Sequence, residues 1–440
     1  MGSIVVKFGG SSLATAGQFE KVAAIIRENP ARRYVVASAP GKRCSDDTKV
    51  TDLLYRCYDA ACAGEDFLPT LMEIRQRFAD IIAQLQLQVD LTADFEIIAS
   101  HLRSVPQRDY MASRGEYLNS KLLAAYLGVP FIDATQMILF HADGSFDVEA
   151  SNTTIARKLA NVERAVIPGF YGTLPDGMIH TFSRGGSDVT GSIIARAVGA
   201  DLYENWTDVS GVLAADPRIV ENPRIIDYIT YRELRELSYM GASVLHEDAV
   251  FPVRQANIPI NVRNTNRPSD SGTFIVSTLP PNVHKRKVTG IAGHKGFSSV
   301  YVEKSMMNGE IGFVAKLLNI FVSYGISFDH CPSGIDTVSI IVSTSALAHV
   351  RNEILHEIET QLHPDKVSIE DDLALIAIVG QGMISTKGTA AHIFHIIADA
   401  NINIRMIDQS SNELNIIIAV SETEYELAVQ SLYHAVERAM

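Results

Sequence analysis

The chain opens with SIVVKFGGSS, a β-rich run that ends in a lysine, two glycines and two serines. Such a run predicts a buried strand that feeds a tight turn, because glycine adopts backbone angles that other residues avoid. Backbone N–H groups at a turn that precedes a helix form a site for an anion such as phosphate, and Lys7 would bring a positive charge to it. The spacing is neither that of a P-loop nor that of a dinucleotide fold, so glycines kept for packing are the alternative.

A second segment, TFSRGGSDVTGS at 181–192, repeats this arrangement. Arg184 offers a planar guanidinium group for a carboxylate or a phosphate. Asp188 could orient Lys7 or contact the metal ion on a nucleotide. The alternative is an ordinary turn in which Ser187 or Asp188 caps the helix that follows.

A third loop, NWTDVSGVLAADPR at 205–218, follows another β-rich run. Thr207 and Asp208 stand at the end of the predicted strand, where open α/β sheets bind their ligands, and Arg218 follows ten residues later. Taken singly, these residues are also typical of turns. Loops of this type at three strand ends favour a ligand site.

Two further segments hold candidate polar ligands. In SRGEYLNSKLL, Glu116 is predicted in the first turn of a helix, where it either serves the helix dipole or captures a substrate ammonium group. Thr51 follows the loop SAPGKRCSDDTKV, and its plain interpretation is an N-cap. The thirteen histidines show no metal-binding or catalytic spacing, so we assign no protein metal site.

These segments need a scaffold that brings strand ends together. From residue 4 to about 279, β-rich runs alternate with the helical stretches 50–63, 67–87 and 114–127; the runs are IVVKF, YVVAS, PFIDA, RAVIPGF and IPINVR. The alternation predicts an α/β domain over residues 1–280, with a mainly parallel sheet between helix layers in a three-layer αβα arrangement. LPPNVHKRK at 279–287 then reads as a linker.

The remainder of the chain repeats itself with an offset of 76 residues. Gly312 superimposes on Gly388, and SIIV at 339–342 superimposes on NIII at 415–418. Each copy predicts a ferredoxin-like βαββαβ module, over 288–370 and 371–440, in which a further helix and strand follow the first three strands. The copies hold few clustered catalytic residue types, so a binding or pairing role suits them better than chemistry.

Composition limits the classes of function. The formal net charge of −13 argues against a nucleic-acid surface, and no apolar run approaches the length of a membrane span. Four cysteines without paired spacing are expected to be free thiols. Because no basic and apolar leader begins the chain, the expected compartment is the cytoplasm.

Five segments in order, KFGGSS, SRGE, FSRGGSD, WTDVSGVLAADPRIV and LSYMGASVLHEDAV, closely resemble the signature segments of aspartate kinases, members of the amino-acid kinase family. The resemblance covers essentially the whole chain, since those kinases are followed by two tandem ACT modules. It implies transfer of the γ-phosphoryl group of ATP, with Mg²⁺, to the side-chain carboxylate of L-aspartate. The product would be 4-phospho-L-aspartate, in the first step of lysine, threonine and methionine biosynthesis.

The resemblance also implies roles for single residues. Lys7 would stabilise the transferring phosphoryl group and Asp188 would organise that lysine. The substrate-binding residues would be Ser38, Thr51, Glu116, Phe170, Arg184 and Ser187. The nucleotide-binding residues would be Lys7, Gly9, Gly10, Ser11, Thr207, Asp208 and Arg218. The acceptor carboxylate is already ionised at neutral pH, so catalysis reduces to positioning two anions and neutralising the charge between them.

For the C-terminal modules, the resemblance implies feedback control by lysine, alone or together with threonine. The effector-binding residues would be Met307, Gly312, Phe313, Asp329, Ser333 and Asp336. The alternative for Met307 and Phe313 is that both belong to the core. The modules of relatives pair with those of a partner, which implies a homodimer or a larger homo-oligomer.

Two departures and three rival interpretations accompany the resemblance. Ser243 stands where many relatives have lysine, which removes one expected phosphate contact, and Leu213 stands where they have tyrosine. The nearest rival is a glutamate or acetylglutamate kinase, against which SRGE and the paired modules argue. A regulatory protein that has lost the chemistry is the second rival, and the retention of Lys7, Arg184 and Asp188 opposes it. The length of the chain makes us expect no dehydrogenase domain, which excludes the third rival, a bifunctional enzyme.

Overall fold

The structure is a computed structural model that describes residues 2–183, 185–242, 245 and 247–438. The chain forms two compact units that interleave in sequence. The first comprises Met1–Val212, Ile225–Tyr231 and Val244–Pro280, and the second comprises Leu213–Arg224, Arg232–Ser243 and Pro281–Met440. Because the chain passes between the units several times, the domain boundaries expected from the sequence stay a prediction.

The first unit is built on a seven-stranded sheet with the order β3-β2-β1-β6-β8-β9-β7. The strands are β1 (Ile4–Phe8), β2 (Arg32–Ala37), β3 (Ala165–Pro168), β6 (Leu202–Thr207), β7 (Tyr228–Thr230), β8 (Ile260–Asn264) and β9 (Thr273–Val276). All neighbouring strands pair in parallel except β8 and β9. The mainly parallel α/β sheet expected from the alternating pattern is confirmed.

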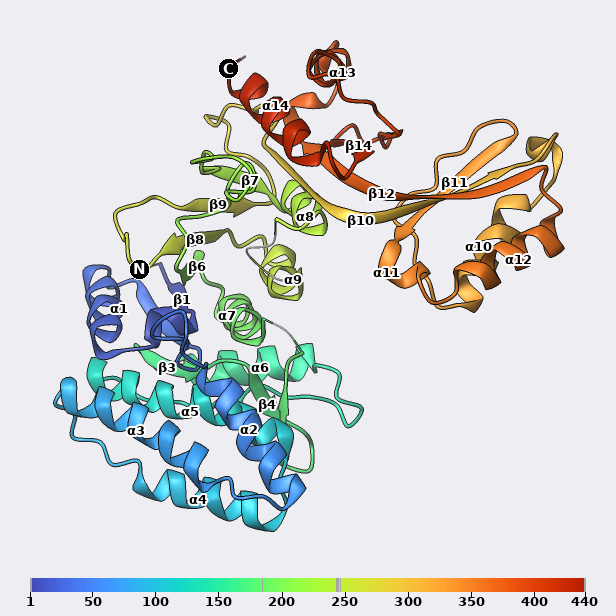
Figure 1. The fold of residues 1–440 in the computed structure, drawn as a ribbon. Helices are drawn as coiled ribbons and strands as arrows, with labels where there is room; N and C mark the ends of the chain where they lie inside the picture. Colours follow the sequence, from blue (N-terminus) through green and yellow to red (C-terminus); the bar gives the residue numbers. More distant parts are fainter. Residues whose placement is uncertain (1, 184, 243–244, 246, 439–440) are drawn as a thin grey trace. The chain divides into compact units, whose positions relative to one another are not determined.

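Helices cover this sheet on both faces (Figure 1). The helices of the first unit are α1 (Ala16–Glu28), α2 (Val50–Ala63), α3 (Leu68–Gln84), α4 (Thr92–Ser104), α5 (Arg108–Leu127), α6 (Val148–Leu159), α7 (Gly186–Ala197) and α9 (Glu247–Gln255). Val6 and Phe8 of β1 belong to the core formed with α1 to α5, whereas Lys7 contacts Asp188 of α7. Alternate residues of β1 therefore serve opposite layers, as the period of a strand requires.

Two local predictions were wrong. The helix around SRGE begins at Arg108, so Glu116 lies in its third turn and not in the first. The run PFIDA forms only an isolated bridge between Phe131 and Val166, because Asp133 accepts from the N–H of Thr135 and starts a 3₁₀ turn. A short antiparallel hairpin, β4 (Tyr171–Thr173) with β5 (Ile179–Thr181), completes the unit.

The second unit is built on a five-stranded antiparallel sheet with the order β11-β10-β12-β14-β13. Its strands are β10 (Gly290–Glu303), β11 (Thr337–Ser343), β12 (Lys366–Val379), β13 (Met406–Asp408) and β14 (Asn415–Ser421). Its helices are α10 (Phe313–Ser323), α11 (Thr344–Leu347), α12 (Arg351–Leu362), α13 (Thr389–Asp399) and α14 (Tyr425–Arg438), while α8 (Tyr231–Tyr239) begins at the end of the first unit's β7.

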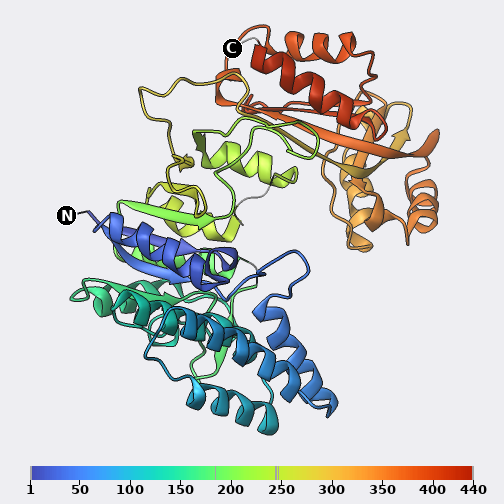
Figure 2. The same ribbon diagram turned by 60° about the vertical axis from the view of Figure 1, so that its left-hand side comes forward.

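The predicted repeat is visible in this unit. Helices α10 and α13 begin and end 76 residues apart, and each is preceded by a glycine with positive φ, 83° at Gly312 and 85° at Gly388. Positive φ favours glycine, which explains why this residue recurs at both helix starts. Helices α10 and α12 lie together beside β10 and β11 in both views, as the orange segments of Figures 1 and 2 show.

The two modules share their long strands. The first part of β10, residues 290–295, pairs with residues 374–379 of β12, and the second part, residues 297–303, lies between β11 and residues 366–373 of β12. The sequence predicted that the second module would end in a strand after its last helix, but α14 ends that copy in the described residues and β10 supplies the strand instead. No helix within the described ranges is both long and apolar enough to span a bilayer.

Candidate functional site

Lys7 and Asp188 form an ion pair at the carboxyl end of β1. The Nζ of Lys7 lies 2.6 Å from the Oδ1 of Asp188, and the lysine is buried. The Nδ2 of Asn205 donates to the same Oδ1 at 2.6 Å. Lys7 and Asn205 are register partners on the adjacent strands β1 and β6, so the sheet itself aims both side chains at the first turn of α7.

Helix α7 brings Asp188 to this point through a glycine-rich start. The helix begins at Gly186 and its N-cap is Gly185, with a φ of 58°, so neither Ser187 nor Asp188 caps it as the alternative interpretation had it. A Cβ on Gly186 would lie 2.4 Å from the ring of Phe170, and a Cβ on Gly169 would lie 2.6 Å from Ser187. Because Gly169 and Gly186 carry no side chain, the β3–β4 loop can pack closely against the start of α7.

The KFGGSS turn also packs closely against a second loop. The N–H of Gly41 donates to the carbonyl of Gly10 at 2.8 Å, and a Cβ on Gly10 would lie 2.7 Å from the carbonyl oxygen of Ala39. A Cβ on Gly9 would lie 3.6 Å from the Nζ of Lys7. The turn thus lies between the lysine and the 38–49 loop, and Ser11 follows it within the 3₁₀ helix Gly10–Leu13.

Glu116 is a buried carboxyl group on α5. Burial raises its pKa to about 8, although the backbone N–H of Ala39 hydrogen-bonds to it and favours the ionised form. Its Oε2 is buried and has no hydrogen-bond partner. A buried acceptor without a partner is costly, so this oxygen fits a cationic ligand group that arrives with a substrate.

The 38–49 loop joins Glu116 to the glycine turn. The N–H of Ser38 donates to the carbonyl of Phe8 at 3.2 Å, and the carbonyl of Ser38 accepts from Nδ2 of Asn119, one turn beyond Glu116, at 2.7 Å. Thr51 lies in the first turn of α2, whose N-cap is Lys49, so the N-cap interpretation of Thr51 was wrong.

The predicted nucleotide residues are divided between the two units. In the first, the hydroxyl of Thr207 donates to Asp208 at 3.1 Å, just beyond β6. In the second, the exposed Arg218 pairs with Asp216 at 2.6 Å. Arg184 and Ser243 lie outside the described residues. The convergence of this set on one nucleotide therefore stays a prediction.

Comparison with known proteins supplies the context for this geometry. The profile of the "Amino acid kinase family" matches residues 2–264, and that of the "ACT domain" matches residues 376–436. The chain belongs to the amino acid kinase family. It is 41% identical to "Aspartokinase 3" of Bacillus subtilis (strain 168), over 98% of this chain and 97% of that protein.

Solved structures agree with this assignment. The aspartate kinase of Clostridium acetobutylicum is 48% identical, with a TM-score of 0.92 and coverage of 99% of this chain and 100% of that one. Escherichia coli aspartokinase III, solved with aspartate and ADP, has a TM-score of 0.74 at 24% identity, over 98% and 99% of the two chains, and shows a shared fold alone. The resemblance to aspartate kinases that the sequence motifs indicated is confirmed.

Within this kinase, the predicted effector residues lie in the first C-terminal module. Met307 and Phe313 are buried in its core, as the alternative interpretation had it. Asp329 accepts a hydrogen bond of 2.6 Å from the hydroxyl of Tyr239, at the end of α8. Ser333 forms an isolated bridge with Val338, and the carbonyl of Asp336 accepts from the N–H of Lys304 at 2.8 Å.

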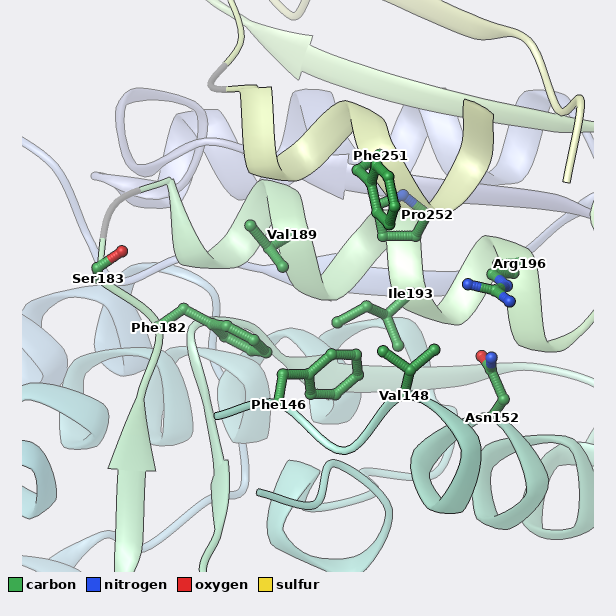
Figure 3. Close-up of a pocket in the computed structure, with 10 residues that line it drawn as sticks. All are labelled: Phe146, Val148, Asn152, Phe182, Ser183, Val189, Ile193, Arg196, Phe251 and Pro252. Atoms are coloured by element: carbon green, nitrogen blue, oxygen red, sulfur yellow. The ribbon is translucent and has the colours of Figure 1, made fainter. Parts of the chain in front are cut away.

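A cavity of about 300 Å³ lies along the outer side of α7. Figure 3 shows Phe146, Phe182, Val189 and Ile193 lining it, with Arg196 and Asn152 at one end. None of the ten described residues that line it carries a carboxyl group, and neither Lys7 nor Glu116 is among them. Its lining includes Ser183 and Val189, which flank Arg184 and Asp188 in the sequence.

Sequence reasoning missed several residues that contact the predicted site residues or the loops that carry them. Asn205 follows Glu204 in β6 and is buried, and a polar residue at a central strand end was the available signal. Asn119 and Gly41 lie in SRGEYLNSKLL and SAPGKRCSDDTKV, where other residues are the candidate ligands. Arg77, which contacts the 38–49 loop, lies inside an amphipathic helix where no motif marks it.

Proposed function

We propose that this protein is an aspartate kinase that transfers the γ-phosphoryl group of ATP to the side-chain carboxylate of L-aspartate. The observation that carries the proposal is the cluster of Lys7, Asp188 and Asn205 where β1, β6 and α7 meet. Open α/β sheets bind ligands beyond the carboxyl ends of their strands, where this cluster lies. The aspartokinase name of the Bacillus relative and the order of the signature segments support the assignment.

Glu116 would bind the α-ammonium group of the substrate. Its buried Oε2 lacks a partner, and a cation there would restore the ionised form of the carboxyl group. Arg184 would bind the α-carboxylate, because its position in FSRGGSD matches that of the family motif. Ser38, Thr51, Phe170 and Ser187 would shape the remainder of the pocket.

Lys7 would neutralise charge on the phosphoryl group during its transfer. The two reactants are anions and repel each other, so a preorganised cation at the point where they meet lowers the barrier. Asp188 and Asn205 fix the lysine in place, which leaves little reorganisation for the reaction itself. No general base is required, because the acceptor carboxylate is ionised at neutral pH.

Gly9, Gly10 and Ser11 would contact the phosphates of ATP, while Thr207, Asp208 and Arg218 would hold the nucleoside. Within the described residues, no group of three or more His, Cys, Asp or Glu side chains could hold a metal ion. Mg²⁺ does not need such a group, because it is commonly held by one or two carboxylates together with substrate phosphates. Asp188 is the candidate carboxylate, and the ion would offset phosphate charge.

The C-terminal modules would confer feedback inhibition by lysine, alone or together with threonine. Asp329 would receive the effector's ammonium group, next to the backbone of 333–336. The same region exposes Met306, Ile311 and Ile335 at 80%, 97% and 70%. Apolar side chains exposed to this degree are typical of interaction surfaces, which supports a homodimer or larger homo-oligomer formed through these modules. We expect the enzyme in the cytoplasm.

The test is an assay of ADP release with aspartate, glutamate and acetylglutamate as separate acceptors. An acyl phosphate product would also be trapped by hydroxylamine as a hydroxamate. We expect turnover with aspartate and inhibition when lysine is added, with threonine tested alone and in combination. Activity with glutamate or acetylglutamate but not aspartate would contradict the proposal, and a complete lack of kinase activity would favour a regulatory protein.

A further inference from the structure

A buried arginine on α3 holds the loop that borders the proposed site. The Nη2 of Arg77 donates to the carbonyl of Gly41 at 2.7 Å, and its Nη1 donates to the carbonyl of Thr48 at 2.5 Å. The same guanidinium group lies 3.4 Å from the carboxylate of Asp47. The arginine therefore fixes both ends of the segment 41–48, from a helix that is otherwise part of the apolar core.

The arrangement is costly, which indicates that the loop requires it. Arg77 is 4% exposed, its Nε lacks a hydrogen-bond partner, and burial lowers its pKa. The segment between β2 and α2 has no regular secondary structure, so its inward carbonyls need donors from elsewhere. A planar guanidinium group can serve two carbonyls and a carboxylate at once.

Asp47 forms further hydrogen bonds within the loop. It accepts from the backbone N–H of Arg43 at 2.8 Å and from the Arg43 guanidinium at 2.9 Å. These hydrogen bonds hold the pKa of Asp47 well below its usual range, so the carboxylate stays ionised opposite Arg77. Arg43 is about half exposed, whereas Arg77 is buried, so Arg77 is the arginine that holds the loop from the protein interior.

The 38–49 loop contacts residues of the proposed site at two points. Gly41 donates to the carbonyl of Gly10, and the two glycine backbones are too close to admit a Cβ on either. Ala39 hydrogen-bonds to the Glu116 carboxyl group. A shift of Gly41 would therefore move the glycine turn beside Lys7, and a shift of Ala39 would move the amide that helps to ionise Glu116.

We propose that Arg77 is a positioning residue for phosphoryl transfer: by holding the 38–49 loop, it keeps the Gly10 turn and Glu116 in the geometry that the substrates need. The inference rests on the proposed function. Small displacements at a reacting centre can cost about 100-fold in rate, so the effect of a loosened loop should be large. The nucleoside side of the site, at Thr207 and Asp208, has no described contact with this loop and should be affected less.

The experiment compares the wild type with Arg77→Ala, Arg77→Lys and the matched control Arg75→Lys on the same helix, where Arg75 donates to Thr92. For each protein, kcat and the KM values for acceptor and ATP are measured with the acceptor that the wild type uses. We expect Arg77→Ala to lose about 100-fold in kcat/KM for the acceptor, which depends on both Glu116 and the Gly10 turn, whereas the KM for ATP, which depends on the Gly10 turn alone, should rise by less than about tenfold. Arg77→Lys should lose at least about tenfold, because an ammonium group cannot span both carbonyls.

Chemical rescue separates positioning from folding. Millimolar guanidinium chloride, far below denaturing concentrations, should raise kcat/KM of Arg77→Ala at least about fivefold, while the same concentration of urea should not. If guanidinium restores the melting temperature but not activity, or if folded Arg77→Lys matches the wild type, the inference is wrong. Should Arg77→Ala fail to fold, the kinetics of Arg77→Lys decide. A wild type inactive with aspartate would instead contradict the proposed function.

Discussion

Lys7 and Asn205 lie opposite each other on neighbouring parallel strands, and both contact one oxygen, the Oδ1 of Asp188, at 2.6 Å. Two strands and one helix start are thus joined at a single carboxylate. This arrangement holds a buried cation in one place, and it gives each of the three residues a distinct expected contribution.

Replacing Asp188 with asparagine should lower kcat by about 100-fold or more, because the buried lysine loses its counter-charge and its orientation. Asn205 acts on the lysine only through Asp188, so Asn205→Ala should cost less, about tenfold. Initial-rate kinetics of ADP formation with aspartate measure both. A larger loss of kcat for Asn205→Ala than for Asp188→Asn would contradict the inference that Asn205 acts on Lys7 only through Asp188.

The raised pKa of Glu116 predicts a pH-dependent affinity for aspartate. The ammonium group needs the ionised carboxylate, and with a pKa of about 8 the ionised fraction rises steeply between pH 6 and 8. The KM for aspartate should therefore fall by roughly 50-fold over this interval. In Glu116→Gln, the KM should be high and independent of pH; a wild-type KM that does not change with pH would contradict the assignment.

Glu116 also makes the stability of the ligand-free protein depend on pH, and here a rise in pH is unfavourable. The unfolded chain releases the Glu116 proton near pH 4.5, whereas the folded protein keeps it up to about pH 8. The folded state binds more protons in this window, so the contribution of Glu116 to the free energy of unfolding falls as pH rises through it. Denaturant titrations should show that this slope is smaller in Glu116→Gln.

The contact between Gly10 and the 38–49 loop makes a steric prediction. A Cβ on Gly10 would meet the carbonyl oxygen of Ala39 at 2.7 Å and the nitrogen of Gly41 at 3.1 Å, both of them backbone atoms. Gly10→Ala should lower the free energy of unfolding by about 1–3 kcal/mol and reduce kcat/KM for aspartate. Gly17, in the first turn of α1, has nothing within 4 Å, so Gly17→Ala is the matched control and should be neutral or slightly stabilising.

The hydrogen bond from Tyr239 to Asp329 predicts how the effector competes. An effector ammonium at Asp329 would displace the tyrosine hydroxyl, whose pKa is raised to about 12 chiefly by this hydrogen bond. Tyr239→Phe should lower the lysine concentration for half-inhibition by about threefold, and Asp329→Asn should abolish inhibition.

Tyr324, which donates to Glu357 at 2.9 Å in the same module, provides the control for this substitution. Tyr324→Phe should leave the inhibition curve unchanged. If lysine inhibits Tyr239→Phe and Tyr324→Phe equally, the effector ammonium does not compete with the Tyr239 hydroxyl for Asp329. That result would not bear on the proposed kinase activity.

Much of this architecture could be predicted, because its signals are local. The helix at 50–63 and the strand at 4–8 lie where the patterns put them, and the 76-residue offset reproduces α10 and α13 residue for residue. What the sequence did not reveal depends on contacts distant in the chain. Asn205 matters through its register with Lys7, and β10 contributes to both modules because it pairs with two halves of β12.

Local signals also misled the prediction at particular residues. SRGE predicts a helix start, but α5 begins earlier, at Arg108, so Glu116 is a buried mid-helix acid and not a partner of the helix dipole. Arg77 gives no motif at all, since an arginine in an amphipathic helix usually faces solvent. Its role becomes visible only when the loop from Gly41 to Thr48 is seen against it.

The most direct test of the central claim is the pair of constants kcat and aspartate KM for Lys7→Ala. If Lys7 stabilises the transferring phosphoryl group, kcat should fall by at least about 100-fold while the KM for aspartate stays within about threefold of the wild type. A variant that keeps near-normal kcat, or that loses only aspartate affinity, would show that phosphoryl transfer does not take place at this lysine.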